Sequence, residues 1–156
     1  MKKNRLTLLA IVSEIEREIE NLKELQSELH SIRDKGGIIY ARSKGSILHD
    51  FYNCCERIFK KIAIEINEGY EETDRWHKAL LYRMTIPLRN IRPQVISEEL
   101  AADLDEYLVF RHLFRSIYGF ELKGDRIGRL ADKFEIISQR FVKEIEVFLE
   151  YLRTEI

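Results

Sequence analysis

The chain has 156 residues, of which 45% are hydrophobic and 34% are charged, and it contains only seven glycines and two prolines. This composition excludes a disordered or low-complexity chain, and the length predicts one domain over residues 1–156 with a single core. The formal net charge of −1 excludes a general attraction to nucleic acid or to a membrane surface, so any such binding depends on a local patch.

Two long amphipathic helices are expected in the N-terminal half. Apolar residues at helical spacing predict the first over about residues 5–33 and the second over about residues 46–67. Gly45 is expected to interrupt any continuation of the second helix toward the N-terminus. Cys54 and Cys55 are adjacent within it and point about 100° apart, so they are expected to be small core residues and not a disulfide.

The chain shows no paired cysteine framework, no cleavable apolar leader and no apolar run long enough to span a bilayer. A cytoplasmic location without membrane association is therefore expected. No spacing typical of metal ligands is visible, so no metal or other cofactor is expected.

Three further helices are expected in the C-terminal half. The third begins near residue 74 and ends at Pro87, because proline removes a backbone donor. The fourth follows a loop, has Ser97 as its N-cap and ends at Gly119, and the fifth runs from about residue 125 to the C-terminus. No segment shows the alternation of a half-buried strand. The fold class predicted is therefore all-α, an antiparallel bundle of about five helices.

The fourth helix carries an arginine on an apolar ridge. Alternating steps of four and three residues place six side chains on that ridge: Leu100, Leu104, Tyr107, Arg111, Phe114 and Tyr118. A guanidinium at such a position must find an anion or another acceptor, because arginine is almost never fully buried unless it is paired. Val109 and neighbouring apolar residues lie off the ridge, so this helix is expected to be central or to contact a partner.

Arg111 and Arg115 lie one helical turn apart, and two guanidinium groups at that spacing can hold a phosphate through forked hydrogen bonds. Neither arginine has an acidic residue three or four positions away. The alternative, that Arg111 has only a structural role, therefore requires a carboxylate from another helix.

Three polar residues accompany the arginines. His112 and Ser116 are also one turn apart, and a histidine here can move a proton near neutral pH. Tyr118 brings a hydroxyl beside the arginines; the alternative is a packed ring with an exposed oxygen.

A basic stretch lies upstream of this helix. Residues 75–97 contain no acidic residue, and Lys123, Arg126 and Arg129 continue the basic character further on. Its basic residues are Arg75, Lys78, Arg83, Arg89 and Arg92. The stretch is either a solvated face or a phosphate-binding surface.

Four segments carry a resemblance to a known family. They are residues 47–52 (ILHDFY), 75–80 (RWHKAL), 92–99 (RPQVISEE) and, above all, 111–122 (RHLFRSIYGFEL). The chain resembles the HEPN superfamily, and specifically the HepT-like proteins encoded beside minimal nucleotidyltransferases in toxin–antitoxin pairs. The resemblance implies a HEPN-like helical bundle that forms a homodimer, in which two copies of the motif face one RNA-binding cleft. RNA and a minimal nucleotidyltransferase antitoxin are thus the implied partners.

The resemblance also assigns roles to single residues. Ribonucleases of the superfamily have an arginine, commonly a polar residue after it, and a histidine after four to six intervening residues; HepT-like members add a tyrosine two positions later. Arg111 matches the arginine, His112 the polar residue and Tyr118 the tyrosine. Ser116 stands where the histidine is expected. The implied activity is metal-independent RNA cleavage with Arg111 stabilising charge, and the implied control is attachment of AMP to Tyr118 by the nucleotidyltransferase.

Ser116 leaves three interpretations open, because serine is not a base near neutral pH and losing a general base costs about 10²- to 10⁴-fold in rate. In the first, cleavage survives because His112 takes the place of the missing histidine, or because Arg42 and His49 form a displaced version of the pair. The displaced pair is disfavoured, because Gly45 is expected to interrupt the helix between them. The chain is otherwise a non-catalytic subunit that keeps the dimer and the nucleotidyltransferase partner. The third interpretation is a helical scaffold unrelated to nucleotides.

Overall fold

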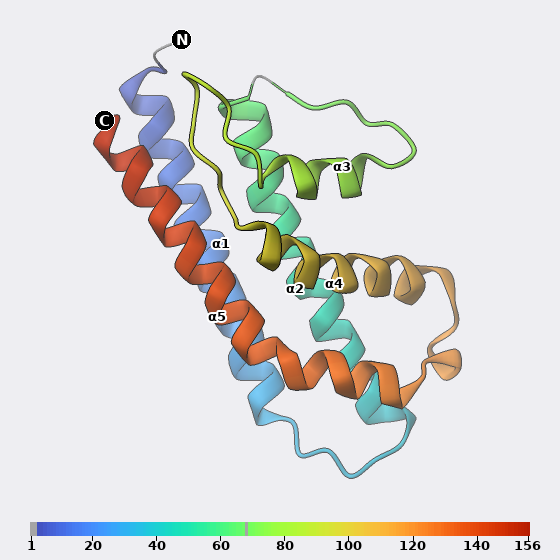
Figure 1. Cartoon of the computed structure of the whole chain (residues 1–156). Coiled ribbons are helices and arrows are strands. Elements are labelled where there is room, and N and C mark those ends of the chain that lie inside the picture. The colour runs from blue at the N-terminus through green and yellow to red at the C-terminus, as the bar shows by residue number, and fades with distance from the viewer. Residues whose placement is uncertain (1–2, 68) are drawn as a thin grey trace.

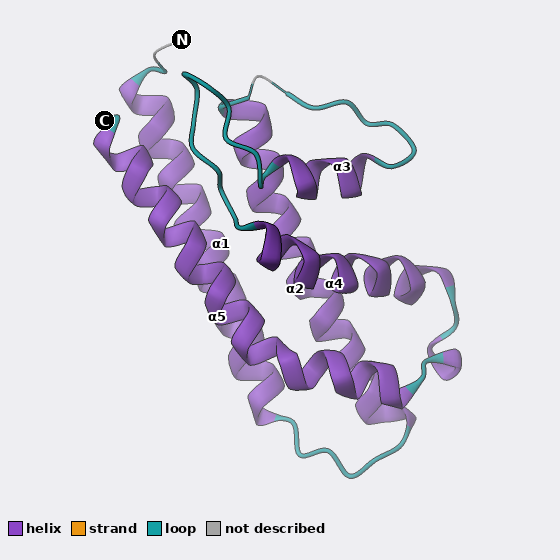
Figure 2. Cartoon of the chain, in the orientation of Figure 1, coloured by secondary structure: helices purple, strands orange, loops and turns teal. Residues whose placement is uncertain are grey.

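The computed structural model describes residues 3–67 and 69–156, and these residues form five α-helices and one short 3₁₀-helix (Figures 1 and 2). The elements are α1 Arg5–Ser31, α2 Ile38–Glu65, α3 Trp76–Arg83, α4 Glu98–Ser116, η1 Gly119–Glu121 and α5 Gly124–Thr154. Within the described ranges there is no strand, and the predicted all-α bundle of about five helices is confirmed. None of the described helices has the length and hydrophobicity that a membrane span requires.

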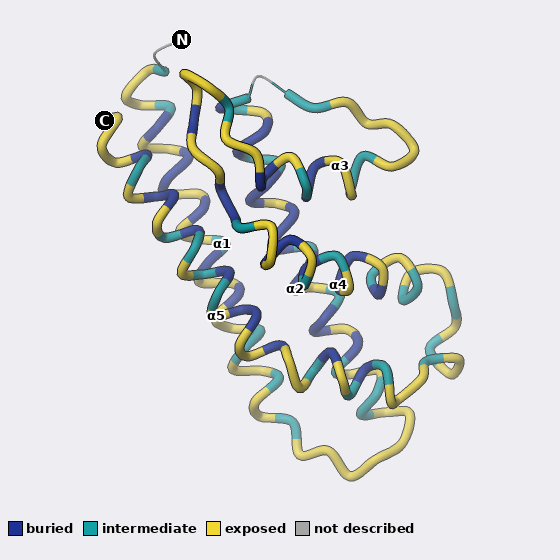
Figure 3. Tube along the Cα trace, viewed as in Figure 1, coloured by how far each residue is buried: buried dark blue, intermediate teal, exposed yellow. Residues whose placement is uncertain are grey.

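α2 is the central helix of the bundle. It packs against α1, α3, α4 and α5 and also contacts η1, while α1 and α5 lie side by side along one edge (Figure 1). The inner faces of these helices are buried (Figure 3). Fully buried residues on α2 include Phe51, Tyr52 and Phe59. The fourth helix was expected to be central or to contact a partner. In the single chain it is not central, because α4 buries one face and leaves Val109 49% exposed, and contact with a partner stays a prediction.

α2 begins eight residues earlier than predicted and runs through Gly45 without interruption. Gly45 is buried, and a Cβ atom there would lie 3.2 Å from Cε2 of Phe114 and 3.4 Å from Cζ of Phe110. Glycine within a helix costs roughly 0.5–1 kcal/mol relative to alanine, but here its missing side chain lets α4 pack closely. The break in the chain comes instead at Gly37, whose φ of 97° favours glycine.

α4 begins as predicted and ends earlier. The side chain of Ser97 accepts from the backbone N–H of Leu100 at 3.1 Å, and Glu144 of α5 accepts from the Ser97 N–H at 2.5 Å. The helix ends at Ser116 because the next two residues are extended. Tyr118 therefore lies outside the helix, and the predicted ridge contains only five of its six members.

Candidate functional site

Arg111 is half-buried on α4 and is held by a residue of α2. Its Nε donates to Oδ1 of Asn53 at 2.5 Å. Among the described residues, Asn53 is the only hydrogen-bond acceptor of this guanidinium, and no carboxylate lies within 4.0 Å of its nitrogens. The carboxylate that a purely structural role required is replaced by a neutral amide, so Arg111 forms no ion pair among the described residues. The two terminal nitrogens keep their donors for a ligand.

His49 belongs to the same cluster, one turn before Asn53 on α2. Its Nδ1 lies 3.4 Å from Nδ2 of Asn53 and 3.3 Å from Oδ1 of Asp50, and its ring packs on Phe114 with centroids 5.1 Å apart. Nε2 of His49 is buried without a hydrogen-bond partner among the described residues. Asn53 thus links an imidazole to the guanidinium of Arg111.

Arg42 and His49 lie on one continuous helix, two turns apart, which overturns the expectation that Gly45 separates them. Arg42 is exposed and its guanidinium lies directly over Gly119, where an added Cβ would come within 2.1 Å of Nε. α2 therefore contributes Arg42, His49 and Asn53 along the line where it meets the C-terminal half of α4 and η1.

The last turn of α4 carries the other predicted site residues. His112, Arg115 and Ser116 are all exposed. The Ser116 hydroxyl donates to the carbonyl oxygen of His112 at 2.6 Å, so it closes the helix end and gives no proton acceptor to the site. Arg115 extends the positive charge of Arg111 by one turn toward the solvent.

Tyr118 begins the 3₁₀ turn and its side chain is 71% exposed. The alternative of a packed ring is wrong as regards the core. Among the described residues the ring stacks on Phe120 alone, at a centroid distance of 5.3 Å and an angle of 8°.

The basic stretch is not one continuous surface. Arg92 is 3% exposed, and its guanidinium donates to Oδ1 of Asn67 and to the carbonyl oxygens of Arg83, Ile86 and Pro93. Burial lowers the pKa of Arg92 to about 10, which leaves it charged at neutral pH. Arg92 fixes the loop between α3 and α4, and it is not available to a phosphate.

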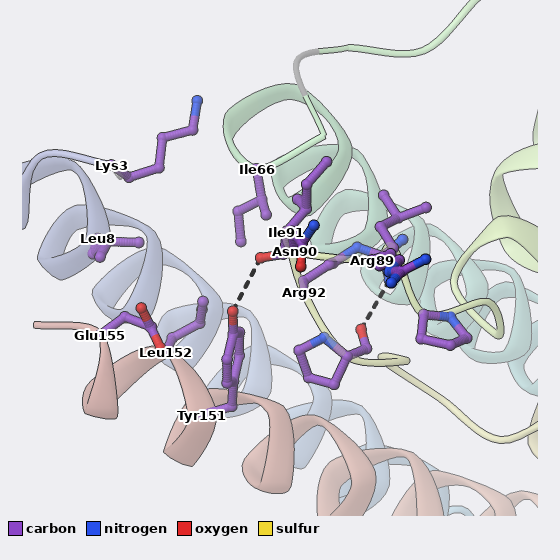
Figure 4. Close-up of a pocket in the computed structure, with 13 residues that line it drawn as sticks. Lys3, Leu8, Ile66, Arg89, Asn90, Ile91, Arg92, Tyr151, Leu152 and Glu155 are labelled. Carbon is purple, nitrogen blue, oxygen red and sulfur yellow. Dashed lines mark hydrogen bonds between the residues drawn. The ribbon is translucent and has the colours of Figure 1, made fainter. Parts of the chain in front are cut away.

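A cavity of about 560 Å³ lies beside this loop, near the ends of α1 and α5 (Figure 4). Tyr151 donates to the carbonyl oxygen of Ile91 at its wall, and Arg89 and Glu155 add opposite charges. None of the predicted site residues lines this cavity.

The predicted core role of the two cysteines is confirmed. Cys54 and Cys55 are buried and free. Burial raises the pKa of the Cys54 thiol to about 12, and burial also raises the pKa of Cys55 well above its ordinary value. Both are neutral thiols at physiological pH and are poor nucleophiles.

The sequence interpretation identified Arg111 and the exposed residues after it, and it missed Asn53 and Phe120. Asn53 lies four residues after His49 on the same face of α2, and that spacing was the available signal. Phe120 lies two residues after Tyr118. Side chains at this spacing do not meet on an α-helix, and the two rings stack because the chain leaves the helix before Tyr118.

A family model described as "HepT-like protein" matches residues 43–152, which is more than half of the chain and includes all of α3, α4 and η1. No curated protein and no solved structure matches the chain.

Proposed function

The chain belongs to the HepT-like family of the HEPN superfamily, and from this membership we propose that it is the toxin component of a toxin–antitoxin pair that binds RNA at Arg111. The observation that carries the proposal is the neutral partner of Arg111. A half-buried guanidinium fixed by an amide oxygen keeps its full charge for a ligand. The paired N–H donors of a guanidinium match the geometry of phosphate as they match that of carboxylate, and RNA supplies phosphate.

Arg111 is oriented by its Nε bond, so its terminal nitrogens can donate to two oxygens of one phosphate. Arg115 lies one turn further along α4 and adds a second cation that is exposed. Together they give a local positive site on a chain whose net charge is −1. RNA binding at this site is expected to weaken steeply with salt.

The proposal extends to metal-independent cleavage, in which a ribose 2′-hydroxyl loses its proton to a base and attacks the adjacent phosphorus. The bond from phosphorus to the 5′-oxygen of the next nucleotide breaks, which leaves a 2′,3′-cyclic phosphate and a 5′-oxygen that takes up a proton, and Arg111 stabilises the charge that develops. His112 follows Arg111 in the chain and is exposed, so it is the histidine best placed to accept the proton. His49 is linked to Arg111 through Asn53, and α2 is continuous through Gly45, but Nε2 of His49 is buried away from a ligand.

The decisive experiment compares wild type with Arg111→Ala on RNA. Loss of cleavage and a clear loss of RNA affinity are expected for Arg111→Ala, while Arg17→Ala, which removes an exposed arginine of α1, is expected to behave as wild type. A wild-type protein that leaves RNA intact in all conditions would eliminate cleavage, and one that does not bind RNA would eliminate the whole proposal.

A second function is favoured by Ser116, whose hydroxyl is committed to the helix end. The chain is then a non-catalytic subunit that keeps the fold and the nucleotidyltransferase partner. Ser116→His separates the two functions, because a gain of RNA cleavage or of growth arrest is expected only if serine is what disables the site.

Control by the partner is proposed at Tyr118. Its 71% exposure supports modification by a nucleotidyltransferase, because an enzyme needs access to the hydroxyl. Co-expression with a minimal nucleotidyltransferase, the partner proposed here, is expected to add the mass of one AMP group to wild type and none to Tyr118→Phe. An unchanged intact mass of the co-expressed wild type would contradict this part.

A further inference from the structure

The turn after α4 presents two aromatic rings to the solvent. Tyr118 is 71% exposed and Phe120 is 70% exposed, and their rings are nearly parallel at an angle of 8°. Each ring covers one face of the other, so at this exposure the outer faces remain open. Large aromatic rings gain most of their stabilisation from burial, and this pair forgoes it in the single chain.

The turn that carries the rings is held in place by its own hydrogen bonds. Glu121 accepts from the backbone N–H of Tyr118 at 3.0 Å, and the N–H of Glu121 donates back to the Tyr118 carbonyl at 2.9 Å. The N–H of Leu122 donates to the carbonyl of Gly119 at 3.2 Å. Because the backbone is fixed, little conformational entropy is lost when a ligand contacts the rings.

Cations flank the aromatic pair. The guanidinium of Arg42 lies over Gly119, between the two ring-bearing residues in sequence, and Arg115 is exposed on the preceding helical turn. Neither guanidinium has an ion-pair partner in the described part of the chain, and an aromatic surface near two such groups matches a ligand that has flat rings and a negative backbone. Unpaired RNA has both, whereas the bases of a duplex are stacked inside it.

We propose that Tyr118 and Phe120 form a stacking platform for unpaired bases of RNA, with Arg42 contacting the adjacent phosphate. This inference rests on the proposed function and adds a second contact region to it. Arg111 then binds the backbone, while the aromatic pair selects single strands over duplexes. The site uses two residues, Arg42 and Phe120, that the family match leaves without a role.

The test is the affinity of the full chain for a fluorescein-labelled single-stranded oligouridine and for an RNA duplex of the same length, measured by anisotropy at low salt. Phe120→Leu is expected to weaken single-strand binding by about 5- to 150-fold, the range of one base–aromatic stack. Phe120→Tyr and Tyr118→Phe keep both rings and are expected to lose less affinity than Phe120→Leu loses. Val147→Ala, at a position 65% exposed on α5, is the matched apolar control.

Arg42 is tested by a substitution at its neighbour. Gly119→Ala places a methyl group where the Arg42 guanidinium lies and must displace it, and because this is the far end of a flexible side chain the fold is expected to survive. Single-strand affinity is expected to fall in Gly119→Ala and in Arg42→Gln alike. Unchanged affinity in both variants would remove Arg42 from the site.

The outcomes separate the inference from the function on which it rests. If Phe120→Leu binds single strands as wild type does while Arg111→Ala does not, the platform is wrong and the proposed function stands. If wild type binds neither RNA, the proposed function fails. If Phe120→Leu loses affinity and light scattering shows that it has also become monomeric, the rings form an interface between two copies, and the platform is overturned. Wild-type affinity for the duplex equal to that for the single strand also overturns it.

Discussion

Asn53 holds the guanidinium of Arg111 in place without neutralising its charge, because its side chain is a neutral amide. Sequence patterns were enough to single out Arg111, because a charged residue on an apolar ridge is conspicuous. They were not enough to find Asn53, because the two residues are 58 positions apart and meet only where α2 crosses α4. An amide on a helix surface is ordinary, and its role depends on the tertiary contact.

Replacing this amide by a carboxylate is expected to weaken RNA binding without loss of fold. Asn53→Asp keeps the size of the side chain and gives Arg111 a counter-charge. The slope of log affinity against log salt concentration is therefore expected to become shallower by about one, the effect of losing one phosphate contact. Affinity measured across a salt series checks this, with Asn4→Asp, at the exposed N-cap of α1, as the control. The same affinity and slope in Asn53→Asp and wild type would show that Arg111 does not meet phosphate.

Two helical glycines show why element boundaries were the weaker part of the sequence interpretation. Gly45 was expected to end a helix by its low propensity, but packing against Phe110 and Phe114 overrides that preference. The end of α4 was misplaced at Gly119 for a related reason, because Glu121 closes a separate turn on Tyr118. Both outcomes depend on contacts that periodicity does not contain. The α1 and α5 boundaries, which rest on long apolar repeats, were predicted to within about two residues.

Gly45 and Gly128 are expected to respond in opposite ways to substitution. Gly128 lies in α5 with no atom within 4 Å of an added Cβ, so Gly128→Ala is expected to raise the free energy of unfolding by about 0.5–1 kcal/mol. Gly45→Leu forces a side chain into the α2–α4 contact and is expected to lower it by about 1–3 kcal/mol. Urea unfolding followed by circular dichroism measures both. A stable Gly45→Leu variant would mean that α2 and α4 are not packed as closely as described.

At the scale of the molecule, the fold class followed from the helical spacing of apolar residues. Which helices pack against which did not follow from it. Periodicity shows that a helix has a buried face, but it does not show which neighbours cover that face. α2, not α4, proved to be the axis of the single chain. The outer face of α4, with Val109 49% exposed, remains uncovered in the described residues and is the face that the expected homodimer has available.

A homodimer predicts a mass in solution twice the 18.6 kDa of one chain, measured by light scattering. Val109→Glu is expected to lower the dimer fraction, because a charge at an apolar contact loses its hydration. Val147→Glu makes the same change on α5, where the valine is 65% exposed, and is expected to leave the dimer intact. If both variants have the mass of wild type, α4 is not the dimer face.

The close approach of Arg42 to Gly119 also has a consequence for how the family can diversify. A side chain at position 119 and a long side chain at position 42 compete for the same volume, so a larger residue at 119 displaces the end of a long residue at 42. Relatives that carry a bulkier residue at the position of Gly119 are expected to have a short residue at the position of Arg42, and a pairwise mutational scan should show a larger residue at 119 tolerated better after Arg42→Ala. The two positions would then covary across evolution although 77 residues separate them in the chain.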